Sequence, residues 1–357
     1  MARHLILSCD GGGIRGYLSS LLLQRLNRDL GIFGDNNQNI DFYAGTSTGG
    51  LIALALAYGK SIDAVVNLYA TEGAQIFNPL EIQLGCFVSQ LENLSLPEAV
   101  KLEAGTFQDV KEIWQVLYDD IGNPSLRTVL ESFVPGNPLL SALTSKVMVA
   151  TFQLSAPQTN PPSWGPLVID NLPDSQGGST HLYDAALSTS AAPVYFPPYQ
   201  HPQFGWCSDG GLFANNPAAL AIGRAIDQGQ SLSDIVLLSI GTGITTASLP
   251  VSDSGRLCFG LTRWVWFETS GPTPAFPLLN SMMDGVSAAN DYLGRQLLGD
   301  GNNGGRYMRA NPVLPYPIAL DDYSPAALKM LEQAAEAYFA SPDWKAIEQW
   351  IKTEYHR

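Results

Sequence analysis

The sequence predicts an α/β fold in which helices cover a mainly parallel β-sheet. Short apolar segments of strand length recur along the chain, and segments with apolar residues at helical spacing lie between them. Two of the predicted strands also end in a glycine-rich turn that leads into a predicted helix. A chain of 357 residues with 45% hydrophobic content can bury the core that such a fold needs.

The first strand, turn and helix lie at the start of the chain. Residues 5–9 form a short apolar segment and are predicted to be a buried strand. Apolar residues recur at helical spacing over 17–30, which predicts a helix. Residues 10–16 between them are therefore predicted to form a strand-to-helix turn.

A second unit repeats this order. Residues 40–44 are predicted to be a strand, 45–50 a tight turn and 51–58 a helix. This helix is apolar on nearly every side, so we expect it to be buried. Two glycine turns are thus expected at the ends of two strands.

The rest of the chain continues the alternation of strands and helices, and its tail is expected to form an outer layer on the sheet. Further strands are predicted at 146–154, 167–170 and 235–240, and further helices at 110–118, at 217–226 and, with a break near Ser341-Pro342, over 325–355.

We expect residues 1–357 to form a single domain. The Pro- and Gly-rich stretches 156–166 and 299–305 are typical of surface loops, and neither marks a change of composition large enough for a domain boundary. The motifs described below lie within 1–245, and 246–357 is predicted to be a helical region packed on the sheet.

The charge balance is acidic, with 33 Asp and Glu residues against 19 Lys and Arg residues and a net charge of −14 at pH 7. This charge repels phosphate backbones and anionic membrane surfaces. We therefore expect no nucleic-acid partner.

The cysteines and the apolar runs bear on metal binding, disulfides and cellular location. Cys9, Cys86, Cys207 and Cys258 form no C-x-x-C pair, which argues against a zinc site and against a dense disulfide framework, and we predict no metal site. The N-terminal apolar stretch is too short for the core of a signal peptide, and no apolar run approaches the roughly 20 residues of a membrane helix. The expected location is the cytoplasm, with any membrane contact peripheral.

The second glycine turn has the form G-x-S-x-G, with Ser47 between Gly45 and Gly49. A predicted strand precedes it and a predicted helix follows it, as in a nucleophile elbow, where a sharp turn projects the serine hydroxyl above the sheet. The helix N-terminus would also favour an oxyanion at the attacked carbonyl. The alternative is a small-residue turn in which Ser47 or Thr48 caps the helix. The context favours Ser47 as a nucleophile.

The first glycine turn, DGGGIRG, has two functional interpretations. Gly11, Gly13 and Gly16 satisfy G-x-G-x-x-G, the dinucleotide fingerprint, whereas consecutive glycine N–H groups could equally form an oxyanion hole. The second strand ends in Gly-Thr-Ser rather than in an acidic ribose ligand, and Asp10 would repel a pyrophosphate. The oxyanion interpretation is therefore favoured, with a plain helix-entry turn as the remaining alternative. Arg15 could assist the oxyanion, hold a lipid phosphate or lie on the surface.

A serine nucleophile needs a base, and the four histidines do not supply an obvious one. A conventional triad places histidine last in chain order, and the histidine that follows Asp209 is His356, the penultimate residue. His4 starts the first strand, His201 is predicted to lie in a Pro- and aromatic-rich loop, and His181 remains a candidate. A direct Ser–Asp pair becomes attractive by elimination.

Asp209 is the best-placed carboxylate, because it starts a glycine-flanked turn with Gly210 and Gly211. Asp-Gly-Gly turns are common for structural reasons alone. The assignment of Asp209 therefore depends on the motifs that accompany it.

Several segments together resemble the patatin-like phospholipases, and their order along the chain is that of the family. The resemblance covers roughly the first 245 residues, and the remainder is similar to the C-terminal region of bacterial members. The segments are 10–16, 45–50, 72–78 (EGAQIFN), 190–198 (SAAPVYFPP) and 209–211.

The resemblance implies the patatin-like fold, a three-layer α/β/α sandwich with a mainly parallel central sheet. It also implies a calcium-independent lipid acyl hydrolase of the phospholipase A or lipase type, without a cofactor, in which Ser47 is the nucleophile and Asp209 activates it. A dyad accounts for the absence of a suitable histidine. The residues that would line the oxyanion hole are Gly11, Gly12, Gly13 and Arg15.

The expected substrate is a phospholipid or another acyl lipid, and the acidic charge favours zwitterionic or neutral lipids. Segments 80–87, 262–267 and 282–283 are candidates for an interfacial docking surface or an acyl channel, with ordinary core packing as the alternative. Two other functions remain open. Some bacterial proteins that resemble this chain degrade membrane lipid on a cyclic-nucleotide signal, and a nucleotide-binding or inert storage protein would show no esterase activity.

Overall fold

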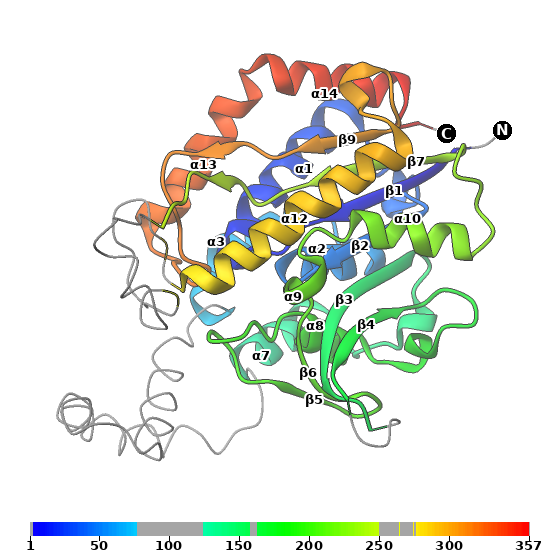
Figure 1. Ribbon diagram of the computed structural model, residues 1–357, viewed down its shortest axis with the longest axis vertical. Coiled ribbons are helices and arrows are strands. Elements are labelled where there is room, and N and C mark those ends of the chain that lie inside the picture. The colour runs from blue at the N-terminus through cyan, green and yellow to red at the C-terminus, as the bar shows by residue number, and fades with distance from the viewer. Residues whose placement is uncertain are drawn as a thin grey trace.

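The computed structural model describes residues 3–76, 124–157, 163–249, 264, 274 and 276–356. In these residues helices lie on both faces of a central sheet, so the chain is a three-layer α/β/α sandwich, as predicted (Figure 1). Several sequence predictions fall outside the described residues, namely the helix at 110–118, the apolar segment 80–87, Cys86, Cys258 and the aromatic segment 262–267 apart from Trp264.

The parallel part of the sheet is built around β1 (His4–Cys9), which lies between β2 (Phe42–Thr46) and β7 (Ile235–Ile240). β3 (Lys146–Ser155) pairs in parallel with β2, and β9 (Tyr307–Ala310) pairs in parallel with β7. The four strands predicted here are confirmed, whereas β9 lies where the sequence analysis predicts no strand.

The other edge of the sheet is antiparallel. β4 (Gly165–Asp170) pairs with β3 and confirms the predicted strand there. β6 (Gly205–Asp209) also pairs with β3, and β5 (Tyr199–His201) pairs with β6. These two strands are short and lie in a Pro- and Gly-rich stretch, so the sequence pattern does not reveal them. The expectation that His201 lies in a loop is wrong, because this residue ends β5.

The register of β3 brings the ends of two strands together. Thr46 at the end of β2 pairs with Ala150, and Asp209 at the end of β6 pairs with the next residue, Thr151. β4 pairs with both Ala150 and Thr151 on the other side of β3, so β2 and β6 occupy the same side. Because β2 is parallel and β6 antiparallel to β3, their C-terminal ends meet head to head.

Helices cover both faces of the sheet (Figure 1). One face is covered by α1 (Gly16–Leu30), α2 (Thr48–Tyr58), α3 (Ile62–Ile76), α7 (Pro124–Phe133), α8 (Leu182–Thr189), α13 (Pro325–Phe339) and α14 (Pro342–Thr353). The other face is covered by α9 (Gly211–Ala214), α10 (Ala218–Asp227) and α12 (Pro277–Leu298). A separate parallel pair joins β8 (Ile244–Thr245) to β10 (Val313–Leu314).

The buried side chains explain why the central strands are apolar throughout. Leu5 and Leu7 of β1 pack into the cluster on the α1 face, whereas Ile6 between them packs into the cluster on the α10 face. α2 contacts β2, β3, α1 and α8, which accounts for its apolar residues on every side.

Local signals set several helix ends. α1 and α2 each end at a glycine with a left-handed conformation, Gly31 and Gly59. Ser341 accepts a hydrogen bond from the Trp344 N–H and Pro342 occupies the first turn, so α14 begins where the tail was predicted to break.

The helix α12 lies within 246–357, which was predicted to be a helical region, and it contains the apolar segment 282–283. Gly285 and Gly294 weaken its helical pattern, and contacts with α9 and α10 stabilise it instead. A Cβ atom at Gly294 would lie 2.4 Å from the Tyr307 ring, so this glycine permits close packing on β9. None of the helices in the described part of the chain is both long and apolar enough to cross a membrane.

Candidate active site

Ser47 lies in the sharp turn between β2 and α2 that the G-x-S-x-G pattern predicts. Its backbone has φ 55° and ψ −126°, a conformation that non-glycine residues rarely adopt. A Cβ atom at Gly45 would lie 2.2 Å from the Gly49 carbonyl oxygen, and one at Gly49 would lie 2.1 Å from the Cys9 carbonyl oxygen. Both glycines are therefore required for the strand and the helix to approach each other at this turn.

Thr189, at the end of α8, holds this turn in place. The Ser47 N–H donates to Thr189 Oγ1 over 3.0 Å, and the Thr189 hydroxyl donates to the Ala150 carbonyl of β3. Next to them the hydroxyls of Thr48 and Tyr69 share a hydrogen bond. The strained backbone of the serine is thus fixed by buried side chains from two other helices.

Asp209 ends β6 and is 1% exposed. Its Oδ1 accepts a hydrogen bond from the Gly211 N–H over 2.7 Å, and its own N–H donates to the Ala191 carbonyl over 2.8 Å. The Ser208 hydroxyl donates to the same carbonyl. The segment 190–198, quoted for its family resemblance, therefore holds the aspartate in place.

The electrostatic surroundings of Asp209 favour its protonated form. Burial raises the pKa of Asp209 to about 7, and the Ser47 hydroxyl and the Gly211 N–H offset part of this rise. Among the described residues, Oδ2 of Asp209 has no hydrogen-bond partner of ordinary geometry. The carboxyl therefore lies near the serine hydroxyl without a closed hydrogen bond, and it titrates near neutral pH.

The glycine loop after β1 presents two N–H groups that have no partner among the described residues, those of Gly12 and Gly13. The Gly11 N–H is already used, because it donates to the Asn215 carbonyl over 2.9 Å. The Gly12 carbonyl accepts hydrogen bonds from the N–H and the Nε of Arg15, each over 3.2 Å. In a trans peptide the carbonyl and the following N–H point in opposite directions, so the Gly13 N–H points away from Arg15.

Arg15 does not line the same pocket as Ser47. It lines a different pocket, which Asp10, Asp284 and Asp291 also line. Burial lowers the pKa of this guanidinium, and Asp284 opposes the effect. Arg15 therefore fixes the glycine loop through its hydrogen bonds to the Gly12 carbonyl.

The remaining motif glycines allow close approaches. A Cβ atom at Gly16 would lie 2.1 Å from Thr48 Oγ1, and one at Gly210 would lie 2.3 Å from the Ala150 carbonyl oxygen. Both clashes involve neighbours of Ser47 or Asp209. Gly16 therefore lets the start of α1 pack against the turn that contains Ser47, and Gly210 lets the turn after Asp209 pack against β3.

Ser47 and Asp209 line one pocket, and Gly13 lies on its wall. No described histidine lines it, and His201 instead accepts hydrogen bonds from the backbone N–H groups of Gln203 and Phe204. The other lining residues are mostly apolar and are Thr48, Leu51, Ile76, Leu126, Ser190, Ala192, Tyr195, Phe196, Met283, Leu320 and Asp321.

A second, apolar cavity adjoins this pocket, because both are lined by Leu51, Ile76 and Leu126. Side chains of α2, α3, α7 and α8 form its walls. An apolar space therefore extends from the serine pocket into the helical layer.

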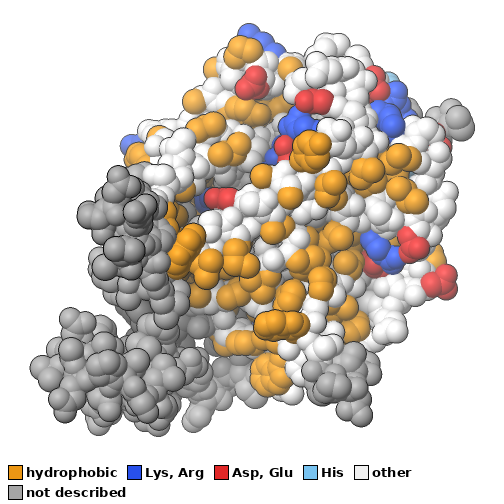
Figure 2. All heavy atoms as spheres, viewed as in Figure 1, with side chains coloured by type: hydrophobic (Ala, Val, Ile, Leu, Met, Phe, Trp, Pro, Cys, Tyr) orange, Lys and Arg blue, Asp and Glu red, His pale blue; other side chains and the backbone are white. Residues whose placement is uncertain are grey.

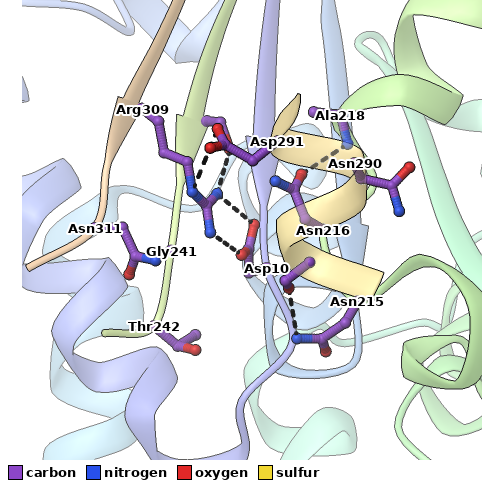
Figure 3. A network of polar contacts seen from close by, with 12 residues as sticks. Asp10, Asn215, Asn216, Ala218, Gly241, Thr242, Asn290, Asp291, Arg309 and Asn311 are labelled. Atoms are coloured by element: carbon purple, nitrogen blue, oxygen red, sulfur yellow. Dashed lines mark hydrogen bonds and ion pairs between the residues drawn. The ribbon is translucent and has the colours of Figure 1, made fainter. Parts of the chain in front are cut away.

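A buried ion pair lies under the glycine loop (Figure 3). Arg309 of β9 donates to both carboxylate oxygens of Asp10, over 3.1 and 2.6 Å, and to the Ser239 hydroxyl over 2.7 Å. Asp291 lies 3.8 Å from the same guanidinium. The Asp10 carboxylate is thus paired with Arg309 beneath the loop. No group of three or more potential metal-ligating side chains occurs in the described ranges.

Several residues of the site have no clear sequence signal. Thr189 and Tyr195 lie beside or inside the segment 190–198, so the motif could have indicated them, as Asn-Asn-Pro could have indicated Asn215. Met283 belongs to the apolar segment 282–283, which was a candidate for an acyl channel, whereas Arg309 belongs to β9, a strand that was not predicted, and nothing in its local sequence marks it.

Comparisons with known proteins found a matching family model and several relatives. The family model described as patatin-like phospholipase matches residues 7–222. A cGAMP-activated phospholipase of Vibrio cholerae serotype O1 is 30% identical over 250 residues, which cover 66% of this chain and 63% of the relative. Patatin-17 of Solanum cardiophyllum is 26% identical over 376 residues. The match covers 94% of this chain and 84% of the relative.

The extent of these matches differs between relatives. The chain spans less than two thirds of the length of the cGAMP-activated relatives from Vibrio cholerae and Escherichia coli, at 63% and 62%. Among solved structures, VipD from Legionella pneumophila matches with a TM-score of 0.39 and 12% identity, over 95% of this chain and 67% of that one.

Proposed function

The chain belongs to the patatin-like phospholipase family, and from this we propose that it is a lipid acyl hydrolase that uses Ser47 as nucleophile and Asp209 as base. The observation that carries the proposal is the meeting of β2 and β6 on β3, which places both residues on the wall of one pocket. Substrates are proposed to be phospholipids or other fatty-acyl esters.

The first half of the reaction forms an acyl-enzyme. Ser47 Oγ attacks the ester carbonyl while its proton passes to Asp209, and the proton then passes to the departing alcohol. A carboxylate with a pKa of about 7 is a stronger base than an exposed aspartate and can return the proton near neutral pH. In the second half, water attacks the acyl-enzyme with Asp209 again as base.

The oxyanion is proposed to bind the N–H groups of Gly12 and Gly13. Gly13 lines the serine pocket, and Arg15 fixes the peptide between the two glycines through the Gly12 carbonyl. The proposed oxyanion hole differs from the sequence prediction in two respects. The Gly11 N–H is excluded, because it donates to the Asn215 carbonyl, and Arg15 contributes by fixing the loop through the Gly12 carbonyl. An oxyanion donor of this kind contributes about 10²–10³ in kcat.

The fatty-acyl chain is proposed to enter the apolar cavity that adjoins the serine pocket. Its walls carry aliphatic and aromatic side chains from four helices, and three residues connect it to the pocket that contains Ser47. Burial of each methylene group of an acyl chain would contribute about 0.8 kcal/mol. The cavity therefore accounts for a preference for apolar acyl groups.

Access to lipid is proposed to occur at the face crossed by α12. Met283 lines the serine pocket, whereas Leu278 and Met282 on the same helix are exposed. Figure 2 shows hydrophobic side chains gathered on this face and few charged ones. We propose a cytoplasmic, single-domain enzyme that contacts membranes peripherally, without a cofactor and without a nucleic-acid partner.

A second candidate function is activation by a cyclic nucleotide. It is favoured by two relatives named cGAMP-activated phospholipase, each 30% identical to this chain. Hydrolysis measured with and without cGAMP separates the two candidates, since an activated effector would be silent without it. An inert storage protein would show no hydrolysis in either condition.

The proposal is tested by hydrolysis of a short-chain p-nitrophenyl ester and of phosphatidylcholine vesicles. The wild-type protein is expected to hydrolyse both, whereas Ser47→Ala and Asp209→Asn are each expected to lose at least about 10²-fold in kcat. Circular dichroism would show that both variants fold. Retention of activity in either folded variant would refute the pair.

A further inference from the structure

Two buried carboxylate and amide oxygens form no hydrogen bond of ordinary geometry in the described part of the chain, although the Ser47 hydroxyl lies close to the Asp209 carboxyl. They are Oδ2 of Asp209 and Oδ1 of Asn215, whose residues are 1% and 5% exposed. Buried acceptors are nearly always paired with a donor, because leaving them unpaired costs free energy. The two oxygens therefore indicate a place where a donor binds.

The amide oxygen of Asn215 lies beside both members of the proposed pair. A Cβ atom on Gly11 would be 2.4 Å from Asn215 Oδ1 and 3.2 Å from Ser47 Cβ. A Cβ atom on Gly211 would be 3.2 Å from Asn215 Oδ1 and 3.1 Å from Asp209 Oδ1. Asn215 Oδ1 is therefore adjacent to the serine on one side and to the aspartate on the other.

The neighbours of Asn215 fix which end of its amide faces the pair. Nδ2 donates to the Ser287 hydroxyl over 3.0 Å and to the Gly11 carbonyl over 3.4 Å. Because a carbonyl only accepts hydrogen bonds, the nitrogen must face Gly11 O and the oxygen must lie on the other end. The amide of the next residue, Asn216, is used differently, because its Oδ1 accepts a hydrogen bond from the Ala218 N–H at the start of α10 (Figure 3).

We propose that Asn215 positions the water that hydrolyses the acyl-enzyme. This inference rests on the proposed function. A water molecule has two O–H donors, and it would direct one to Asp209 Oδ2 and the other to Asn215 Oδ1, which leaves a lone pair for the acyl carbon. Asn215 is thus a positioning residue, since its amide neither gains nor loses a proton.

The step balances with water as the one co-reactant. The water oxygen forms a bond to the acyl carbon while one water proton passes to Asp209. The bond between that carbon and Ser47 Oγ then breaks, Asp209 returns the proton to Oγ, and the fatty acid leaves. Acylation needs no such water, so the contribution of Asn215 is confined to the second half of the reaction.

The test compares acylation with deacylation in Asn215→Ala, using p-nitrophenyl butyrate in stopped flow and intact-protein mass spectrometry. We expect a burst of p-nitrophenol at a rate close to that of the wild type, followed by a steady rate lower by roughly 10- to 100-fold. kcat and KM should fall together, and a butyryl adduct should accumulate on the protein. Hydroxylamine, a stronger nucleophile than water, should restore turnover.

Two further variants test whether the loss of deacylation in Asn215→Ala is only a consequence of lower stability. Asn216→Ala removes the adjacent buried amide, whose Oδ1 accepts the Ala218 N–H over 3.0 Å. We expect it to lose stability with no change in the ratio of burst to steady rate. Ser287→Ala removes the partner of Asn215 Nδ2 and serves if Asn215→Ala does not fold, with a smaller loss of deacylation expected.

The inference is wrong if acylation and deacylation fall by the same factor, if no adduct accumulates, or if hydroxylamine gives no rescue in the folded variants. A different result would refute the proposed function itself. In that case the hydrolysis by the wild-type protein would persist in Ser47→Ala, whatever the behaviour of Asn215.

Discussion

Asp209 illustrates how a side chain's chemistry depends on its surroundings. Full burial raises its pKa from the usual range to about 7, while the Ser47 hydroxyl and one N–H stabilise the charge in part. A base must be ionised before it can accept the serine proton. If Asp209 is the base, as proposed, its environment sets the pH at which the site becomes active.

The first prediction is a pH dependence of kcat/KM for a soluble ester. Below about pH 7 Asp209 is protonated, so the rate should fall by about tenfold for each pH unit, and it should level off above that pH. Stopped assays between pH 5 and 9 would measure this. A rate independent of pH over 5–8 in the wild type would contradict the assignment, and Asp209→Asn should show a low, flat profile.

The second prediction concerns Thr189, whose hydroxyl joins the Ser47 N–H to the Ala150 carbonyl. Thr189→Val keeps the shape but leaves two buried groups unpaired, so we expect a loss of about 1–3 kcal/mol in unfolding free energy. A fall in kcat of roughly 10- to 100-fold should accompany it, because the nucleophile moves.

Thr189→Ser is the matched control, because it keeps the hydroxyl and removes the methyl group that packs near Gly50. It should retain most of the wild-type kcat. If Val and Ser at this position reduce kcat equally, the hydrogen bond does not position Ser47.

At this scale the sequence predicts the residues that belong to motifs and misses those that come from distant segments. Ser47 and Asp209 stand in recognisable turns, and the absence of a usable histidine points to their pairing. Asn215 and Arg309 act through contacts made by the folded chain. No local pattern encodes such contacts.

At the scale of elements, the site depends on how strands end. β2 and β6 approach each other from opposite directions along β3, so a parallel and an antiparallel strand place their last residues side by side. A hydrophobic pattern does not specify strand direction for β6, which has five residues. The pairing of the two motifs was therefore predicted from the histidine positions and from the family resemblance, and its geometric cause appears only in the fold.

The third prediction tests the link between β1 and β9. The Asp10–Arg309 pair is 3% and 8% exposed and bidentate. Arg309→Met would leave the Asp10 carboxylate buried without its partner, which should reduce the free energy of unfolding by about 3–5 kcal/mol. Urea denaturation would measure the loss.

The double variant Asp10→Asn with Arg309→Met should regain part of this stability, because it removes both charges. Equal stability of Arg309→Met and the wild type would show that the pair does not stabilise the loop. The free energy of unfolding of Arg309→Lys should lie between those of the wild type and Arg309→Met, since lysine keeps the charge but not the two parallel hydrogen bonds.

At the scale of the whole molecule, the acidic charge and the apolar residues of α12 bear on the proposed contact with lipid. A net charge of −14 opposes binding to anionic membranes. The exposed Leu278 and Met282 lie on the helix that also contributes Met283 to the serine pocket. Binding to neutral bilayers through this helix therefore accords with both features.

The fourth prediction is that Leu278→Asn combined with Met282→Gln weakens binding to phosphatidylcholine vesicles by about 30-fold, since each side chain contributes about 1 kcal/mol when buried. Sedimentation with vesicles would measure this. Hydrolysis of a soluble ester should be unchanged. Ile226→Asn on α10, exposed to a similar degree but outside the pocket lining, serves as the control, and an equal loss in the control would refute docking by α12.

The central claim is that Asp209 activates Ser47, and covalent labelling tests it most directly. A fluorophosphonate probe followed by peptide mass spectrometry should modify Ser47 in the wild type, with a labelling rate that rises through about pH 7. Asp209→Asn should label at least about 10²-fold more slowly. Labelling at another serine, or undiminished labelling of Ser47 in folded Asp209→Asn, would contradict the account.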